Sequence, residues 1–556
     1  MHSIEHKMHH FLPNIFFFLL VTRAFSAWCC LQHEREALLK FKADVNDSSN
    51  RLVSWRGNEC CKWAGVRCNN KTGHVIMLDL RNSYYEWNNH SLSGEINPSL
   101  QNITELEYLD ISYNNFSGNN FPRFISSYRN LNYLNLSTTG LSGIIPHHFG
   151  NLSKLEYLDL SYMPNIYISN VWFLSHLTSL IYLDMFQVNL EDSREWVQVL
   201  NTLPLLQSLY LGSNNLTTIS SSITVVNFSS LGILSIQENE FNSRIPNWIG
   251  DLTKLTMLEL LFCSFVGRVP NQLGNLTKLN KLYLLDYLEG PMPPLLNLNN
   301  LTELDITYVD LKEDISRVVS KLANDTLEKI ELFWLYGTSL TGNLNGWISK
   351  MSNLKVLTLS YNNLNGTIPN AIGNLTSLEC LFLDKNYFSG MIYEAHLANL
   401  SNLKELNLDS NYITVIVDTN WIPQFQLYFL YVSGCKLGPH FPSWLQNQSL
   451  ITNIDMSNTE ISDIVPNWFW NLPSLTSIDL SNNNMSGRLP LNLEHLTNLN
   501  ALLLGNNRFE GEIPSLPYVV EYIDMSNNLF SGHLPTYIEA PKLSILVLSN
   551  ISSMVQ

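Results

Sequence analysis

Cysteine is the residue type whose spacing in this chain most directly predicts chemistry. Five of the eight cysteines lie between Cys29 and Cys68. Geometric strain disfavours a bond between the adjacent residues Cys60 and Cys61. The short step from Cys61 to Cys68 predicts a small disulfide loop, and Cys30 is left to reach Cys60. A zinc site is the alternative, but the CxxC spacing of zinc ligands is absent, so we expect disulfides and no metal.

A pair of carboxylates is the clearest candidate for catalysis. Asp305 and Glu331 could face each other on adjacent strands, roughly 5 Å apart, and imitate the acid pair of a glycosidase. An open sheet, however, gives no water-excluding cleft in which their pKa values could be tuned. The sequence also lacks a nucleophile elbow, a His-Glu-x-x-His motif, a phosphate-binding glycine loop with its lysine and the kinase signatures. We therefore expect no enzymatic activity and no cofactor.

The elements that position these residues are set by an internal repeat. From Leu106 onward, leucine, two variable residues, leucine, any residue, leucine, two variable residues and asparagine return roughly every 24 residues. In Leu354–Asn362, LKVLTLSYN, leucines alternate with Thr358, which is the period of a short strand with one buried face. About twenty copies predict an α/β solenoid, a right-handed leucine-rich-repeat superhelix with a concave parallel β-sheet.

Stacking of neighbouring copies should bury a fixed set of positions in each repeat. In one copy these are Leu354, Leu357, Leu359, Leu364, Ile368 and Ile372. The asparagine that follows each strand should satisfy buried backbone amides, and its clearest examples are Asn362, Asn386, Asn411, Asn483, Asn507 and Asn528. Cys263 and Cys435 occupy the same position, where we expect buried structural thiols.

Length and composition agree with a solenoid. One compact core would not support 556 residues, but a solenoid escapes that limit because each repeat contacts its neighbours alone. Hydrophobic residues make up 45% of the chain and charged residues 14%, so Asn, Ser and Thr supply much of the polarity. The formal net charge of −16 argues against nucleic acid as a partner.

The first residues predict a targeting segment rather than a part of the folded structure. Residues 11–21, FLPNIFFFLLV, followed by small residues at Ala24–Ser26, are typical of a signal peptide. The apolar run is well short of the ~20 residues that a spanning helix needs, and no second long run follows, so we expect the secretory pathway and no membrane span in this chain. The predicted division is signal peptide 1–26, N-terminal cap 27–72 and repeats 73–556. A helix is expected from Glu34 to about Val45 within the cap.

Four segments of the cap carry a family resemblance. EREALLKFK, LVSW at Leu52–Trp55, CCKWAGVRC and GHVIMLDL at Gly73–Leu80 resemble the N-terminal cap of plant extracellular leucine-rich-repeat proteins. The Gly-x-Ile-Pro phrase, as at Gly366–Pro369, is similar to the plant-specific repeat, which implies a second short sheet beside the concave one. The segment Trp421–Gln448 resembles receptor-like proteins of the kind that perceives fungal xylanase and other microbial elicitors. The resemblance covers essentially the whole mature chain.

That resemblance implies a non-catalytic ligand-recognition ectodomain in defence or development signalling. It would bind an extracellular protein, peptide or glycan on the concave sheet and act through a kinase-bearing co-receptor at the plasma membrane. Such proteins usually continue into further repeats, a C-terminal cap and one membrane helix. This chain stops inside a repeat, at LSILVLSNISSMVQ, and we expect a truncated gene model or splice product before a form purposely secreted to the apoplast.

Two alternatives remain at this point. The first is a secreted protein resembling polygalacturonase inhibitors, which share the cap and the repeat, have about half as many copies and block microbial cell-wall hydrolases. Repeat number and the Trp421–Gln448 segment favour the receptor, and the lack of a membrane helix favours the inhibitor. The second alternative is a truncated copy without function.

Eighteen Asn-x-Ser/Thr sequons predict a glycoprotein with glycan on the convex face and flanks. Some of these asparagines are also part of the repeat consensus itself. The predicted acceptors are Asn46, Asn70, Asn89, Asn102, Asn115, Asn151, Asn275, Asn374 and Asn484.

The surface left free for partners should be the concave sheet. Its outward positions carry aromatic residues that depart from the repeat consensus, and ordered exposed aromatics are common in recognition hot spots. The aspartates of the same positions, such as Asp110 and Asp159, more simply fill consensus slots. We expect Cys380 to point outward as well. The predicted ligand-binding residues are Phe262, Tyr283, Tyr308, Phe333, Trp334, Phe382 and Tyr431.

Overall fold

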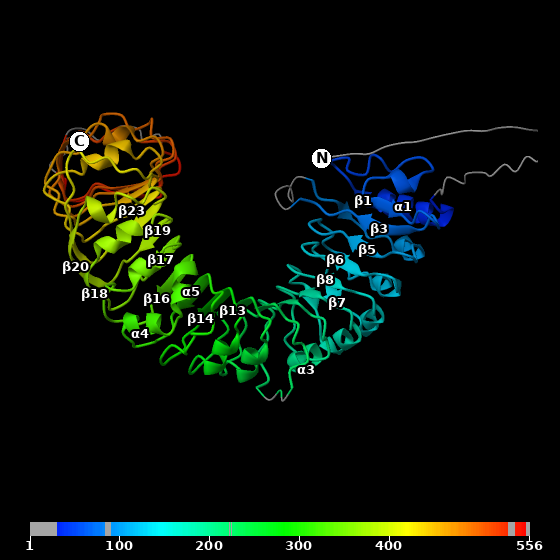
Figure 1. Cartoon of the computed structure of the whole chain (residues 1–556). Helices are drawn as coiled ribbons and strands as arrows, with labels where there is room; N and C mark the ends of the chain where they lie inside the picture. Colours follow the sequence, from blue (N-terminus) through cyan, green and yellow to red (C-terminus); the bar gives the residue numbers. More distant parts are fainter. Residues whose placement is uncertain (1–29, 84–89, 222, 224, 532–539, 552–556) are drawn as a thin grey trace, which may run out of the picture.

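The computed structural model describes residues 30–83, 90–221, 223, 225–531 and 540–551. The predicted signal peptide, Cys29 and Asn89 lie outside the described residues. The chain forms an open arc, with the cap at one end and the main strands toward the inner side (Figure 1). In the described part of the chain, no helix is both long and apolar enough to cross a membrane.

One 21-stranded sheet runs through the whole arc, and this confirms the predicted solenoid. Its strands pair in chain order, all parallel except the first pair, β2 with β3. The strands are β2 (Val66–Cys68), β3 (Val75–Asp79), β5 (Tyr108–Asp110), β6 (Tyr133–Asn135), β8 (Tyr157–Asp159), β10 (Tyr182–Asp184), β11 (Ser208–Tyr210), β12 (Ile233–Ser235), β13 (Met257–Leu261), β14 (Lys281–Leu285), β15 (Glu303–Thr307), β16 (Leu332–Tyr336), β17 (Val356–Thr358), β19 (Cys380–Phe382), β21 (Glu405–Asn407), β23 (Phe429–Tyr431), β24 (Asn453–Asp455), β25 (Ser477–Asp479), β27 (Ala501–Leu503), β29 (Tyr522–Asp524) and β31 (Ile545–Val547).

Small second sheets lie beside the main sheet, as the plant-type phrase implied. Gly366 in β18 has a φ of +79°, a conformation that strains residues with a Cβ. The short strands pair as β1 (Val45–Asn46) with β4 (Ser93–Gly94), β7 (Gly143–Ile144) with β9 (Ile166–Tyr167), β18 (Asn365–Thr367) with β20 (Tyr387–Ile392) and β22 (Tyr412–Val415), and β26 (Ser486–Arg488) with β28 (Arg508–Gly511) and β30 (Leu529–Phe530).

Helices are short outside the cap. The α-helices of the described residues are α1 (Gln32–Asp44), α3 (Trp196–Leu200), α4 (Ile315–Ser320) and α5 (Asn324–Lys329). Single 3₁₀ turns serve most other repeats: η1 (Cys60–Lys62), η3 (Pro98–Asn102), η4 (Arg123–Ser127), η5 (His147–Asn151), η6 (Val171–His176), η7 (Asn247–Asp251), η8 (Asn271–Asn275), η9 (Ile348–Lys350), η10 (Asn370–Asn374), η11 (Glu394–His396), η12 (Ser443–Asn447) and η13 (Phe469–Asn471).

The core runs continuously between the main sheet and these turns. The six apolar positions predicted from one repeat are all buried: Leu354, Leu357, Leu359, Leu364, Ile368 and Ile372. Burial alternates along strands such as β14 and β16, so every second side chain of these strands leaves the core. This alternation decides which residues a partner can reach.

The asparagine after each strand joins consecutive repeats, as predicted. Asn362 is buried, and its Nδ2 donates to the carbonyl oxygens of Leu335 and Leu359 at 2.7 and 3.0 Å. Its Oδ1 accepts from the backbone N–H of Leu340 at 2.9 Å and of Thr338 at 3.1 Å. One side chain therefore satisfies the backbone groups of two repeats.

The two cysteines at this position are buried free thiols, as expected. Each donates a weak hydrogen bond from Sγ, Cys263 to Ile236 O at 3.4 Å and Cys435 to Leu408 O at 3.2 Å. At Cys263, the carboxylate of Asp286 in the next repeat accepts from the backbone N–H groups of residues 263, 264 and 265 at 3.1, 2.9 and 3.2 Å. Asp286 thus takes the acceptor role of the ladder asparagine in its own repeat, where Tyr287 occupies the asparagine position.

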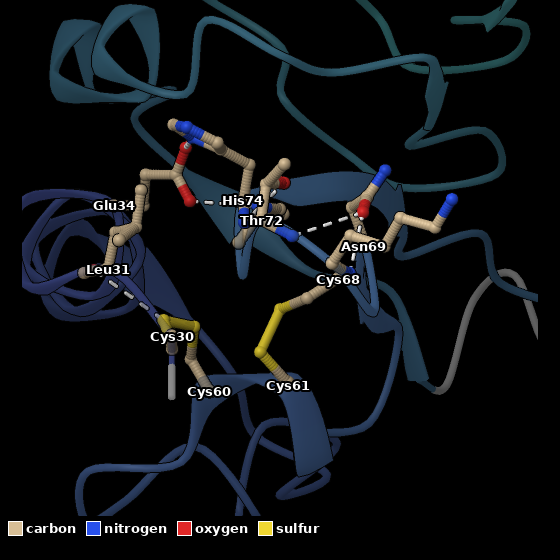
Figure 2. Close-up of a disulfide and its surroundings, with 11 residues drawn as sticks. Cys30, Leu31, Glu34, Cys60, Cys61, Cys68, Asn69, Thr72 and His74 are labelled. Carbon is tan, nitrogen blue, oxygen red and sulfur yellow. Dashed lines mark hydrogen bonds and ion pairs between the residues drawn. A yellow bond between two sulfur atoms is a disulfide. The ribbon is translucent and has the colours of Figure 1, made fainter. Parts of the chain in front are cut away.

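The cap contains both predicted disulfides, Cys30–Cys60 and Cys61–Cys68 (Figure 2). Ala37, Leu38 and Phe41 of α1 are buried against the core. Glu34 of the same helix is completely buried and accepts from the Val75 N–H at 2.8 Å. The cap helix is thereby tied to β3, the first parallel strand.

Candidate functional site

Three residues of each repeat alternate with the buried strand residues and form three rows along the concave face, here called the outward rows. They are the residues one before, one after and three after the central strand residue, as Lys281, Tyr283 and Leu285 lie around Leu282 in β14. Each row continues from strand to strand because the parallel strands pair without a register shift. A ligand on the concave face would meet these rows first.

The outward rows are strongly acidic. From β3 onward they hold two cations among the described residues, and each of these is paired: Arg81 with Asp79 at 3.0 Å and Lys281 with Glu303 at 2.9 Å. The carboxylates of the same rows are Asp79, Asp110, Asp159, Asp184, Glu259, Glu303, Asp305, Asp384, Glu405, Asp409, Asp455, Asp479 and Asp524. Much of the net charge of −16 therefore lies on the concave face.

The middle of this face carries what we call the aromatic patch, defined as Tyr283, Asp305, Trp334, Thr358 and Phe382. These residues lie side by side on β14, β15, β16, β17 and β19. The rings of Trp334 and Phe382 meet edge to face, with centroids 6.5 Å apart, on either side of Thr358. The Thr358 side chain is 1% exposed, and its hydroxyl has no hydrogen-bond partner among the described residues.

A second aromatic row lines the rim of the concave face. Ring centroids are 5.8 Å apart for Tyr287 and Tyr308, 5.4 Å for Tyr308 and Tyr336, and 4.9 Å for Tyr336 and Tyr361. Tyr287 is 84% exposed and Tyr361 50% exposed. Phe262, one of the predicted ligand-binding residues, is 58% exposed at the equivalent turn position.

The structure groups four of the seven predicted ligand-binding residues in and beside the patch: Tyr283, Trp334, Phe382 and, at the rim, Tyr308. Tyr431 lies further along, on β23, and is half-buried. The outward placement of Phe333 is wrong, because its side chain is fully buried and packs near Trp347. It is the central residue of β16, in register with Leu304 and Leu357. Phe333 occupies a position that carries leucine in the neighbouring strands. Because Trp334 follows it directly, the sequence does not show which of these two aromatic side chains faces the core.

The hypothetical acid pair of Asp305 and Glu331 is also wrong. Asp305 lies opposite Trp334 on the adjacent strand. Glu331 precedes that strand and forms an ion pair with Lys355 at 2.7 Å. The two carboxylates therefore belong to different rows and do not form a glycosidase-like pair.

Burial raises the pKa of several carboxylates in the outward rows. Burial raises the pKa of Asp305 to about 6, although its carboxylate accepts from the Thr307 hydroxyl at 2.7 Å. Burial, reinforced by Asp455, raises the pKa of Asp409 to about 7. Burial together with neighbouring Asp159 raises that of Asp184 to about 6. These carboxylates lack a cationic partner and would gain one from a positively charged ligand.

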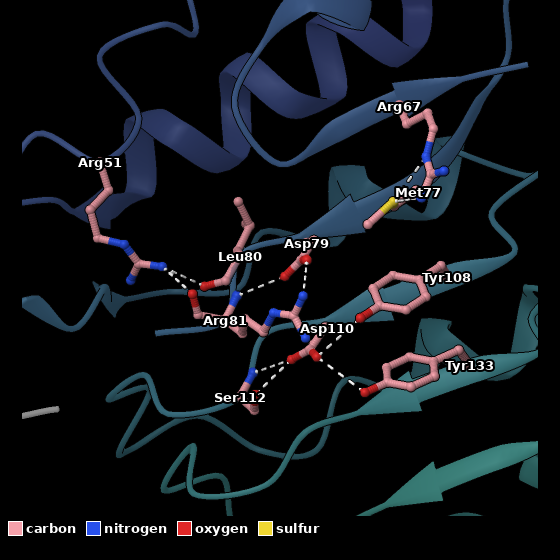
Figure 3. Close-up of polar contacts among 10 residues, drawn as sticks. All are labelled: Arg51, Arg67, Met77, Asp79, Leu80, Arg81, Tyr108, Asp110, Ser112 and Tyr133. Carbon is pink, nitrogen blue, oxygen red and sulfur yellow. Dashed lines mark hydrogen bonds and ion pairs between the residues drawn. The ribbon is translucent and has the colours of Figure 1, made fainter. Parts of the chain in front are cut away.

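A stack of tyrosines at the N-terminal end of the face was not foreseen. The rings of Tyr108, Tyr133, Tyr157 and Tyr182 lie 4.1, 4.3 and 4.3 Å apart and are nearly parallel. Figure 3 shows the hydroxyls of the first two directed at Asp110, which also accepts from Ser112. Tyrosine at the first strand position of four consecutive repeats is the sequence signal that could have predicted it.

Among the described residues, no exposed sequon lies in the outward rows. Seventeen of the eighteen asparagines are described, and all except Asn135 are exposed. Asn135 lies in β6, is 8% exposed and accepts from the N–H and hydroxyl of Ser137. Seven exposed sequons share one repeat position, seven residues before the central strand residue, on the flank that precedes the strands: Asn102, Asn151, Asn227, Asn275, Asn374, Asn399 and Asn447.

Two groups of sulfur atoms are further candidates for chemistry. The Sγ atoms of Cys30, Cys60 and Cys61 lie within 4.8 Å of one another, but all three are in disulfides and so are not thiolate ligands for a metal. Cys380 points outward, as expected, and burial raises the pKa of its thiol to about 11. A thiol with such a pKa is a poor nucleophile at neutral pH.

Two sequence families match the chain. The Leucine rich repeat N-terminal domain matches residues 31–69, and the Leucine rich repeat matches residues 104–166, 335–388 and 425–485. Receptor-like protein EIX1 of Solanum lycopersicum is 32% identical, over 78% of this chain and 50% of the relative. Receptor-like protein EIX2 of the same organism is 31% identical, over 81% and 52%. The chain thus spans about half the length of these curated relatives.

Solved structures show the same architecture. The Arabidopsis receptor kinase HAESA, crystallised with the peptide hormone IDA and the co-receptor SERK1, superposes with a TM-score of 0.60 at 25% identity. That match covers 94% of this chain and 95% of the HAESA chain. A TDR receptor gives a TM-score of 0.63 at 24% identity, over 81% and 82% of the two chains, which bears on the fold alone.

Proposed function

This chain belongs to the plant leucine-rich-repeat receptor-like proteins, and on that premise we propose that it is a ligand-recognition ectodomain that binds its ligand on the concave sheet. The observation that carries the proposal is the aromatic patch, which lies in outward rows that hold no exposed sequon among the described residues. Half-exposed aromatic side chains held on a rigid sheet provide contact area at low entropic cost. The predicted ligand is an extracellular protein, peptide or glycan.

We further propose that signalling passes through a kinase-bearing co-receptor. The superposed HAESA structure contains a peptide hormone and a co-receptor, which supports an assembly of this kind. No catalytic role is assigned to the chain: its relatives are receptor-type proteins, and the one acid pair considered for catalysis is not formed. The proposed location is the extracellular side of the plasma membrane, reached through the secretory pathway. The division into signal peptide, cap and repeats at residues 26 and 72 stays part of this proposal.

The test is direct binding with patch variants. The glycosylated chain, secreted from plant cells, is titrated by microscale thermophoresis with fungal xylanase and a panel of microbial elicitor proteins and peptides. For a ligand that binds, Trp334→Ala and Phe382→Ala should each weaken affinity at least tenfold. Tyr518→Ala removes an exposed aromatic outside the main sheet and should leave affinity within twofold. Equal effects of all three variants, or inhibition of a hydrolase that the patch variants do not relieve, would count against the proposal.

A further inference from the structure

The aromatic patch lies among carboxylates but has no positive charge beside it to pair with them. From β15 to β31, the outward rows contain no lysine or arginine among the described residues. The cations that flank the patch are already paired: Lys281 with Glu303, and Lys355 with Glu331 at 2.7 Å. Lys385, next to Asp384, donates to the Ser410 hydroxyl at 2.9 Å. Asp305 and Asp384 therefore have hydroxyl donors, from Thr307 and Ser360, but no ion pair.

A buried hydroxyl without a partner marks the same spot. Thr358 lies between Trp334 and Phe382 in the outward row, and its Oγ1 is the unsatisfied atom. Buried polar groups normally have a hydrogen-bond partner, and one left alone costs about 1–3 kcal/mol. Thr358 is 1% exposed between the two rings, so a donor reaches its hydroxyl once one ring moves aside. The patch thus offers two ring faces, the carboxylate of Asp305 beside Trp334 and one unpartnered hydroxyl.

Resting on the proposed function, we propose that the aromatic patch anchors an arginine side chain of a basic peptide segment. The guanidinium stacks on the face of Trp334 and donates N–H groups to the carboxylate of Asp305 on the adjacent strand, with the Thr358 hydroxyl on the other side of Trp334 as a further acceptor. Arginine fits better than lysine because its planar group stacks on aromatic rings and carries five donors in a fixed fork. The surrounding acidic rows guide the rest of the segment along the concave face.

The experiment uses peptide probes of defined chemistry at 0.15 M salt, an ionic strength that screens distant charges. An acetylated tetra-arginine peptide is titrated into the full chain by calorimetry, beside tetra-citrulline, which has the same shape without charge, and tetra-lysine. Asp305→Asn removes the carboxylate of the patch. Asp524→Asn removes one from the same row on β29 and is the matched control. Trp334→Leu keeps an apolar side chain but removes the ring face.

The arginine peptide should bind at least tenfold more tightly than the citrulline peptide and more tightly than the lysine peptide. Asp305→Asn and Trp334→Leu should each weaken it at least fivefold, and Asp524→Asn less than twofold. Equal losses for the two aspartate variants would show general attraction to an acidic surface and overturn the proposal, as would equal affinity for arginine and citrulline. If the arginine preference fails while Trp334→Ala still abolishes binding of a ligand from the elicitor panel, the proposed function stands and this inference falls alone.

Discussion

Arg51 of the N-terminal cap donates from Nη1 to Oδ1 of Asn114, the asparagine that follows β5, over 2.8 Å. The Nη2 of the same guanidinium donates to the carbonyl oxygens of Leu80 and Arg81 at 2.8 and 2.7 Å, as Figure 3 shows for these two contacts. In later repeats, the asparagine Oδ1 accepts from backbone N–H groups of the preceding repeat. One cap side chain therefore takes part in the hydrogen-bond ladder that joins the repeats.

Replacing Arg51 should loosen this junction. Arg51→Ala removes charge-assisted hydrogen bonds to four acceptors, the His90 carbonyl oxygen at 3.2 Å included, and should lower the free energy of unfolding of the cap and first repeats by about 2 kcal/mol. Hydrogen exchange of residues 30–83 reports the loss locally. Arg56→Ala, which removes an exposed arginine nearby, is the control. Similar protection in both variants would contradict the assigned role of Arg51.

The ladder itself can be tested with two adjacent asparagines. Asn362 is buried and bonded to two repeats, whereas the side chain of Asn363 is exposed. Asn362→Ala should lower the free energy of unfolding by about 3 kcal/mol because it leaves several buried backbone groups unsatisfied. Asn363→Ala should change it by less than about 0.5 kcal/mol. Urea denaturation of both variants measures these changes. A small change in the free energy of unfolding for Asn362→Ala would mean that water replaces the hydrogen bonds of this side chain.

The two disulfides should differ in their contribution. Cys30–Cys60 joins residues 30 apart, and Cys61–Cys68 joins residues 7 apart. In the loop-entropy account, removing the longer cross-link by Cys30→Ser with Cys60→Ser should destabilise the cap about 1 kcal/mol more than removing the shorter one. Thermal unfolding of the two double variants gives the comparison. The reverse order would show that local strain or packing outweighs the entropy of the unfolded chain.

Acidification should stabilise the concave face. Burial raises the pKa of Asp409 to about 7, above that of an unfolded aspartate near 4. Between pH 4 and 7 the folded state therefore binds more protons than the unfolded state, so this contribution to stability grows as the pH falls. Asp409→Asn should raise the Tm at pH 8 and have little effect at pH 5. A Tm difference that is the same at both pH values would show that Asp409 does not titrate in this range.

Glycan mapping tests the placement of the sequons. Asn135 lies in a strand of the main sheet and is buried, whereas Asn102 and Asn151, in the neighbouring repeats, are exposed on the flank. Mass spectrometry of the protein secreted from plant cells should find glycan at Asn102 and Asn151 and none at Asn135. Glycan at Asn135 in the folded protein would require β6 to be displaced, which would contradict the described sheet.

Much of the fold was predictable because each structural role belongs to a fixed position of the repeat. Leucine spacing gave the strand, the core and the number of copies, and the asparagine gave the ladder. The disulfide pairs followed from cysteine spacing in the cap. Each of these features depends on residues within one repeat or on its immediate neighbour, and local periodicity reports such contacts well.

The candidate site depended on relations that no single repeat contains. Sequence alone placed Tyr283, Trp334 and Phe382 on the concave face, but it also placed Phe333 there, because a one-residue error in strand register exchanges the two faces. The pairing of β15 with β16 decided that Trp334 lies beside Asp305 and that Glu331 does not. The unpartnered Thr358 hydroxyl, the tyrosine stack and the acidic rows became visible through the lateral alignment of strands that lie some 24 residues apart in the chain. The sequence determined which residues each repeat presents, and the tertiary structure decided which of them become neighbours.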